Sequence, residues 1–70
     1  MKIYDSKTFG EALRARRKEL GYTQQDIANF TGFSVSFLSD LERGKKTAEL
    51  EKSLFVAQIL SMDIFMEGRG

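Results

Sequence analysis

Short polar side chains gather on one face of a segment that is expected to form a helix. In the stretch SVSFLSDLERGKK, Leu38 and Leu41 have the spacing of a buried helical stripe. At 100° per residue, the opposite face carries Ser36, Ser39, Asp40 and Arg43. Serine and aspartate compete with the backbone for hydrogen bonds and weaken helices, so a face that only meets water rarely favours them. Their hydroxyl and carboxylate groups could instead bond to a ligand pressed against this face.

Hydrogen bonding to the edges of base pairs is the chemistry that suits such a face. The major groove of B-DNA is about 12 Å wide and admits a helix, and its base edges offer donors, acceptors and thymine methyl groups. Serine hydroxyls can donate or accept, Val35 on one flank can contact a thymine methyl group, and Asp40 can accept from cytosine N4. The alternative is a solvated helix that is merely rich in serine.

Basic residues follow this segment. Arg43, Lys45 and Lys46 stand at its end, where phosphates would lie beside the groove. The net charge of +1 is too small to indicate nucleic acid by itself. However, residues 1–47 hold nine Lys or Arg against six Asp or Glu, whereas residues 48–70 hold two against four. A basic N-terminal part and an acidic C-terminal part predict different partners at the two ends.

The residues before this segment predict a second helix that crosses it closely. Thr23 is an N-cap candidate with Asp26 three residues later, and Gly32 supplies the permissive φ angle of a sharp turn. A small residue at Ala28 lets the two helices approach. Apolar residues would form the wedge between them, namely Ile27, Phe33, Leu38 and Leu41. The pattern predicts a helix-turn-helix, with a generic helical hairpin as the alternative, and free backbone N–H groups at Gln24 would suit a phosphate.

Two further helices complete the expected fold. The first runs over residues 8–20, with Thr8 as N-cap and Glu11 at the capping-box spacing, although Asp5 or Ser6 could also begin it. Its inward residues are expected to be Phe9, Leu13 and Leu20. The last helix starts at Thr47. Its inward residues are expected to be Leu50, Ser53, Leu54, Ala57 and Leu60.

These patterns predict an all-α fold, a compact bundle of four to five helices around a central helix-turn-helix. We expect a single domain over residues 1–70, with a core over about 7–64. Met62 and Ile64 would anchor a short final turn or strand, and residues 65–70 would form a flexible tail or short strand.

The run YTQQDIANFTGFSVSFLSDLERGKK resembles the helix-turn-helix of the Cro/C1-type (XRE) family of bacterial and phage regulators. The likeness covers roughly residues 7–64 and implies a lambda-repressor-like domain, a five-helix bundle that binds operator DNA, mostly as a homodimer. The wider run RARRKELGYTQQDIANFTGFSVSFLSDLERGKKTAEL is similar to the HipB-like antitoxin subgroup. Members of that subgroup repress the operon that encodes them and often pair with a HipA-like kinase toxin.

The resemblance also implies roles for individual residues. Candidates for contact with DNA bases or backbone are Ser34, Val35, Ser36, Ser39 and Asp40. Candidates for contact with phosphates are Gln24, Arg43, Lys45 and Lys46. The resemblance further pairs Arg17 with Glu42 in a partly buried ion pair between the first and third helices, whereas periodicity alone does not choose between Arg16 and Arg17.

Two positions depart from the family pattern. Thr31 stands where the family usually has a small apolar residue, which is tolerable if its hydroxyl bonds back to the preceding turn. Val35 offers no hydrogen bond where many relatives have a polar side chain. Specificity would then depend on methyl contacts and on DNA shape.

The last helix carries a candidate protein interface. Phe55 and Ile59 lie four residues apart, displaced from the stripe expected to be buried. Exposed together they would form an apolar patch that a partner covers, which predicts a homodimer interface. The alternative is that one of the two belongs to the core. The segment MDIFMEGRG could add an intermolecular strand or serve as a docking segment for a toxin or another regulator.

Composition excludes several function classes. The chain contains neither histidine nor cysteine, which removes the usual zinc and acid–base ligands, so we expect no metal, no cofactor and no enzymatic activity. No apolar run approaches membrane-spanning length, and we expect a cytoplasmic protein without membrane contact. The first functional hypothesis is a sequence-specific DNA-binding repressor that acts on a near-palindromic operator. The second is a protein-interaction module, an antitoxin whose main role is to hold a partner.

Overall fold

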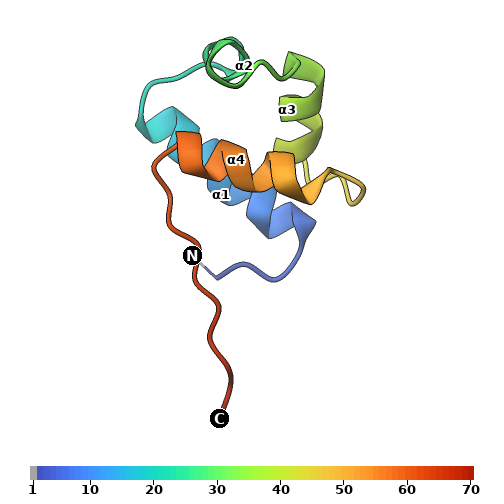
Figure 1. Cartoon of the computed structure of the whole chain (residues 1–70), viewed down its shortest axis with the longest axis vertical. Coiled ribbons are helices and arrows are strands. Elements are labelled where there is room, and N and C mark those ends of the chain that lie inside the picture. The colour runs from blue at the N-terminus through green and yellow to red at the C-terminus, as the bar shows by residue number, and fades with distance from the viewer. Residues whose placement is uncertain (1) are drawn as a thin grey trace.

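The computed structural model describes residues 2–70 and contains four α-helices (Figure 1). In chain order they are α1 (Ser6–Glu19), α2 (Gln24–Thr31), α3 (Val35–Glu42) and α4 (Leu50–Ile59). No strand occurs within residues 2–70, so the prediction of an all-α fold is confirmed. α3 packs against both α1 and α2, and α2 also packs against α4.

Side-chain caps fix where the first three helices begin. Thr23 accepts from the Asp26 N–H at 3.0 Å, and Ser34 accepts from the Phe37 N–H at 3.0 Å, as the sequence predicted. The preferred cap of the first helix was wrong. Asp5 is the N-cap, and its carboxylate accepts from the Thr8 N–H at 2.8 Å. The Thr8 hydroxyl in turn accepts from the Asp5 N–H at 3.1 Å, which closes a capping box one turn earlier.

α4 begins later than predicted. Its N-cap is Glu49, with no side-chain cap hydrogen bond, so Thr47 does not start the helix. Leu50 was expected to face inward but is 69% exposed. Leu50 is exposed because it is the first residue of the helix, at the rim of the core. It lines a surface hollow of about 320 Å³ beside Phe9. Val56, which was not expected in the core, is buried instead.

The core lies where the four helices meet. Its buried apolar residues are Leu13, Ile27, Ala28, Leu38, Leu41, Val56, Ala57 and Leu60. Leu20 was expected to join them but is exposed, since α1 ends at Glu19 and Leu20 serves as its C-cap before the left-handed Gly21. The buried face of α1 consists of Gly10, Leu13 and Arg17.

The chain leaves the bundle after α4 and runs away from it as an extended tail (Figure 1). Met62 packs against the core, whereas Ile64 is 52% exposed and therefore does not anchor the chain. Residues 62–70 form neither the final turn nor the strand that was considered for them. In the part of the chain described, no helix is long and apolar enough to cross a membrane.

Candidate nucleic-acid interface

The turn between α2 and α3 is closed by local hydrogen bonds. The Thr31 hydroxyl donates to the Ile27 carbonyl at 2.8 Å and accepts from the Phe33 N–H at 3.1 Å. Gly32 follows with φ of +79°, a left-handed conformation that glycine adopts without steric cost. The hydroxyl thus bonds back to the preceding turn, which was the condition for tolerating threonine at this position. The turn sets the direction in which α3 leaves α2.

α3 has a buried side and an exposed side, as its sequence predicted. Leu38 and Leu41 are 2% and 4% exposed. The candidate base contacts lie away from them: Ser34, Val35 and Ser36 are exposed, and Ser39 and Asp40 are partly exposed. The structure therefore brings the five candidates together on one accessible surface, which we call the α3 face. Their contact with DNA stays a prediction.

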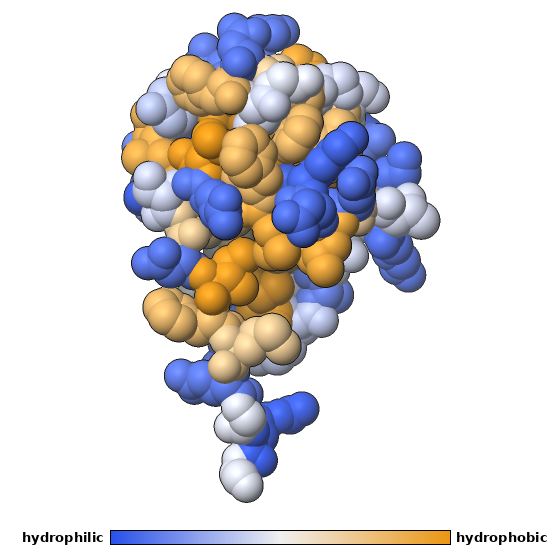
Figure 2. Space-filling view, viewed as in Figure 1, coloured by the Kyte–Doolittle hydropathy of each residue, from blue (hydrophilic) through white to orange (hydrophobic). Residues whose placement is uncertain are grey.

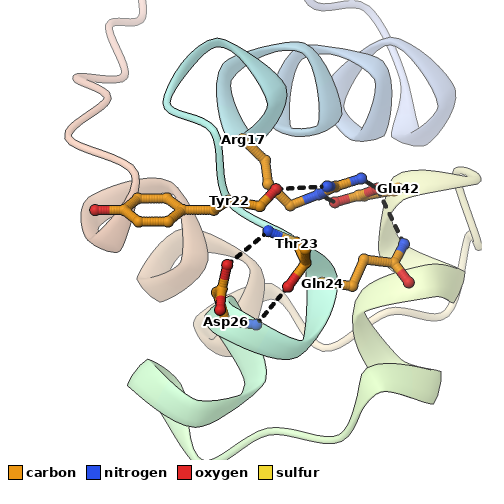
Figure 3. Close-up of polar contacts among 6 residues, drawn as sticks. All are labelled: Arg17, Tyr22, Thr23, Gln24, Asp26 and Glu42. Atoms are coloured by element: carbon orange, nitrogen blue, oxygen red, sulfur yellow. Dashed lines mark hydrogen bonds and ion pairs between the residues drawn. The ribbon is translucent and has the colours of Figure 1, made fainter.

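A buried ion pair ties α1 to the end of α3 (Figure 3). Arg17 Nε lies 2.7 Å from Glu42 Oε2, and Arg17 Nη2 lies 3.0 Å from Glu42 Oε1. Their side chains are only 10% and 8% exposed. Arg17 Nη1 also donates to the Tyr22 carbonyl at 2.8 Å, so the guanidinium bridges α1, the loop before α2, and α3. The hydrogen bond to Glu42 raises the pKa of Arg17 above its ordinary value, which favours the charged guanidinium.

The same carboxylate holds the first residue of α2. Gln24 Nε2 donates to Glu42 Oε1 at 3.1 Å (Figure 3). The side chain proposed to contact phosphate is thus partly engaged within the protein, with one amide N–H left over. The Thr23 hydroxyl accepts a hydrogen bond from the Asp26 N–H. The backbone N–H groups of Gln24 and Gln25, at the first two positions of α2, have no intrahelical partner. These groups at the N-terminus of α2 suit a phosphate.

Gly10 explains how closely α1 approaches α3, and the sequence reasoning did not single it out. A Cβ atom at this position would collide with the Leu41 carbonyl oxygen and would lie 2.6 Å from the Glu42 carbonyl oxygen. The backbone of α3 therefore lies directly on α1 at Gly10, about two helical turns before Arg17. A glycine in the buried stripe of a helix, where alanine is the better helix former, was the available signal.

The basic residues beside the α3 face are paired with Asp40. Arg43 Nη2 lies 2.7 Å from Asp40 Oδ1, and Lys45 Nζ lies 3.4 Å from Asp40 Oδ2. The hydrogen bond from Arg43, together with that from Lys45, holds the pKa of Asp40 below its ordinary value. Lys46 is exposed. Sequence reasoning placed Asp40 against bases and the cations against phosphates, and it missed that they bind each other in the free protein.

The two candidate interface residues on α4 differ in burial. Phe55 is 39% exposed and packs edge-on against Phe33, with ring centroids 5.9 Å apart, whereas Ile59 is partly buried. Lys52 Nζ lies 5.5 Å and 5.8 Å from the ring centroids of Phe33 and Phe37, close enough for cation–π attraction. Part of this aromatic surface is therefore covered by the chain itself. Its use as an interface stays a prediction.

Comparison with known proteins identifies the family. The family model HTH_3, described as helix-turn-helix, matches residues 13–64, which contain the ion pair, the turn and the α3 face. The chain belongs to this helix-turn-helix family. Its relatives include the HTH-type transcriptional regulator y4mF of Sinorhizobium fredii (strain NBRC 101917 / NGR234), 41% identical over 61 residues that cover 84% of this chain and 80% of the relative. Another is YazB of Bacillus subtilis (strain 168), 43% identical over 42 residues that cover 60% of this chain and 61% of the relative.

Solved structures of helix-turn-helix proteins share the fold over the full chain. A HipB–O4 20mer complex has a TM-score of 0.89 and 21% identity, and the match covers 100% of this chain and 99% of that chain. A HipA–HipB–O2–O3 complex gives the same TM-score and identity. The Cro/C1-type resemblance drawn from the sequence is therefore confirmed, and the likeness to HipB is confirmed in the fold.

Proposed function

We propose that this helix-turn-helix protein is a sequence-specific DNA-binding transcriptional regulator that represses by occupying a promoter. The observation that carries the proposal is the α3 face, an accessible and mostly polar surface flanked by Arg43, Lys45 and Lys46. The buried Arg17–Glu42 pair fixes the end of α3 against α1. Its side chains near the first turn are short, which suits close approach to the floor of a major groove. The curated relatives named as transcriptional regulators support the same function.

A homodimer would read two half-sites. Two-fold pairing would place two copies of α3 about 34 Å apart, the spacing of successive major grooves, and would match a near-palindromic operator. Phe55 and Ile59 are our candidates for the contact between copies. A regulator of this kind acts on DNA in the cytoplasm, and we expect it to have no enzymatic activity.

Fluorescence anisotropy with duplex DNA tests the proposal. One duplex comes from directly upstream of the gene for this protein, and the other is a scrambled duplex of equal length, each measured at two salt concentrations. An affinity for the upstream duplex higher by about a thousandfold or more would support an operator reader. Binding to neither duplex, even at low salt, would contradict the proposal.

Substitutions separate base reading from phosphate contact. Lys45→Ala should weaken binding to both duplexes alike and make the slope of log K against log salt shallower by about one, since a phosphate contact carries no sequence information. Val35→Ala and Ser36→Ala should instead change the preference among operator variants that differ in single base pairs. If both leave the preference unchanged, the assignment of the α3 face to base edges is wrong.

A second candidate function is the neutralisation of a partner protein, such as a HipA-like kinase toxin. It is favoured by the similarity in fold to HipB, which has been solved in complex with HipA. Co-expression with the product of the neighbouring gene, followed by size-exclusion chromatography, tests it. A stable complex that forms without DNA would make partner binding the main role, whereas separate elution would favour the regulator alone.

A further inference from the structure

Asp40 stands on the α3 face, yet both of its carboxylate oxygens already have cationic partners. Oδ1 is 2.7 Å from the Arg43 guanidinium, and Oδ2 is 3.4 Å from the Lys45 ammonium. These two cations belong to the group of three proposed to contact phosphates. The side chains of Asp40 and of its two partners remain accessible: Asp40 is 30% exposed, Arg43 73% and Lys45 56%. The pairs can therefore open when DNA approaches.

We propose that Asp40 determines specificity by acting as an intramolecular counterion of Arg43 and Lys45, which weakens binding to DNA that offers Asp40 no hydrogen-bond donor. This inference rests on the proposed function, since it concerns how the same interface distinguishes sequences. The Asp40 carboxylate adds a charge that repels DNA to a surface whose other side chains are neutral or cationic.

The physical reason is an exchange of partners. Arg43 and Lys45 must leave Asp40 to bind phosphates, and the carboxylate then faces a strongly negative duplex without its counterions. Juxtaposed like charges suppress binding to a wrong partner. In the major groove, only the exocyclic amino groups of cytosine N4 and adenine N6 present donors that a carboxylate can accept. The inference therefore assigns a cytosine or adenine to the operator position opposite Asp40.

Because the side chains of Asp40 and its two partners are accessible, we expect loss of the Asp40 charge to change DNA binding and not folding. Ion pairs between accessible side chains contribute little to folding, so removal of the Asp40 charge should leave the fold intact. The hydrogen bond from Arg43 keeps the pKa of Asp40 below 3.8, so the carboxylate is charged at neutral pH. The counterion is thus present whenever the protein meets duplex DNA.

The test compares Asp40→Asn with the wild type and with a matched control, Glu11→Gln. Glu11 is exposed on α1 and takes part in none of the ion pairs found within residues 2–70. Glu11→Gln removes one negative charge, as Asp40→Asn does, but disrupts no such pair. We expect Asp40→Asn to bind the scrambled duplex about tenfold more tightly, with a salt slope steeper by about one to two. Affinity for the upstream duplex should rise less or fall, so the ratio between duplexes decreases. Glu11→Gln should change each affinity by less than about twofold.

Retention on heparin–agarose separates this inference from the proposed function, because heparin is a polyanion without base edges. Asp40→Asn should elute at higher salt than both the wild type and Glu11→Gln. Unchanged elution would overturn the inference even in a protein that binds no operator. Equal gains on both duplexes, or the same gain with Glu11→Gln, would also overturn it, because Asp40 would then contribute only net charge. A wild type that binds neither duplex would refute the proposed function instead.

Discussion

Substitution of Glu42 by alanine should unfold much of the protein and not merely weaken an interface. Glu42 accepts from Arg17 at 2.7 and 3.0 Å and from Gln24 at 3.1 Å, and its side chain is 8% exposed. Alanine would leave the Arg17 guanidinium buried without its carboxylate, although the bond to the Tyr22 carbonyl remains. A charge stranded in this way is costly because the surroundings cannot hydrate it.

The expected loss is a large share of the total stability. Removal of one partner of a buried ion pair costs about 3–5 kcal/mol. A 70-residue chain at typical specific stability has about 3.5–10 kcal/mol in all, so Glu42→Ala should leave a substantial unfolded fraction at 25 °C. The exposed Arg16–Glu19 pair, at 3.0 Å, provides a control, and Glu19→Ala should cost less than about 1 kcal/mol.

Urea denaturation followed by circular dichroism at 222 nm measures both changes. A double variant, Arg17→Met with Glu42→Leu, removes both charges and should recover most of the stability lost in Glu42→Ala, since apolar replacements of a buried pair are often neutral or stabilising. A loss below about 1 kcal/mol in Glu42→Ala would refute the reasoning. So would a double variant no more stable than the single one, because the cost would then not arise from the stranded charge.

Two further changes probe the packing of α1 and its cap. Gly10→Ala should destabilise the protein by about 3 kcal/mol or more, because the added methyl group would collide with the backbone carbonyl groups of Leu41 and Glu42. A urea midpoint equal to that of the wild type would contradict this packing. The N–H of Thr8 holds the pKa of Asp5 below its ordinary value of 3.8, so the carboxylate stabilises the fold above that pH and loses its effect as the pH falls through its folded-state pKa. Urea titrations at about pH 5 and pH 2.5 should show this loss in the wild type, and Asp5→Asn should make the pH dependence smaller, whereas an unchanged dependence would contradict the role of the cap.

The helix-turn-helix was predictable because its determinants are local. Thr23, Gly32 and Ser34 act within three residues of their own positions, through caps and one left-handed φ angle. The boundary of α4 was not predicted correctly, because the sequence favours Thr47, a common N-cap residue type, whereas the helix begins after Glu49 without a side-chain cap. Where a cap bond is missing, the contacts with the other helices decide the boundary.

Two features of the site depend on folded geometry that the sequence does not state. The importance of Gly10 arises only where the backbone of α3 lies against α1, thirty residues later in the chain. The pairing of Asp40 with Lys45 depends on how the chain bends after Gly44, whose φ is +85°. Residue types identified the charged groups at the site, but the folded geometry decides which of them bind one another.

Residues that stabilise the fold and residues that face outward lie side by side at the end of α3. Asp40 and Arg43 lie on the accessible side, whereas Leu41 and Glu42 between them are buried against α1. A substitution scan of this segment would therefore show altered DNA binding at nearly every position, for two different reasons. Losses at the buried positions should accompany a lower urea midpoint and affect all sequences equally. Changes at the exposed positions should leave the midpoint unchanged and alter either the salt dependence or the base preference, so only paired measurements of stability and binding assign a residue to the interface.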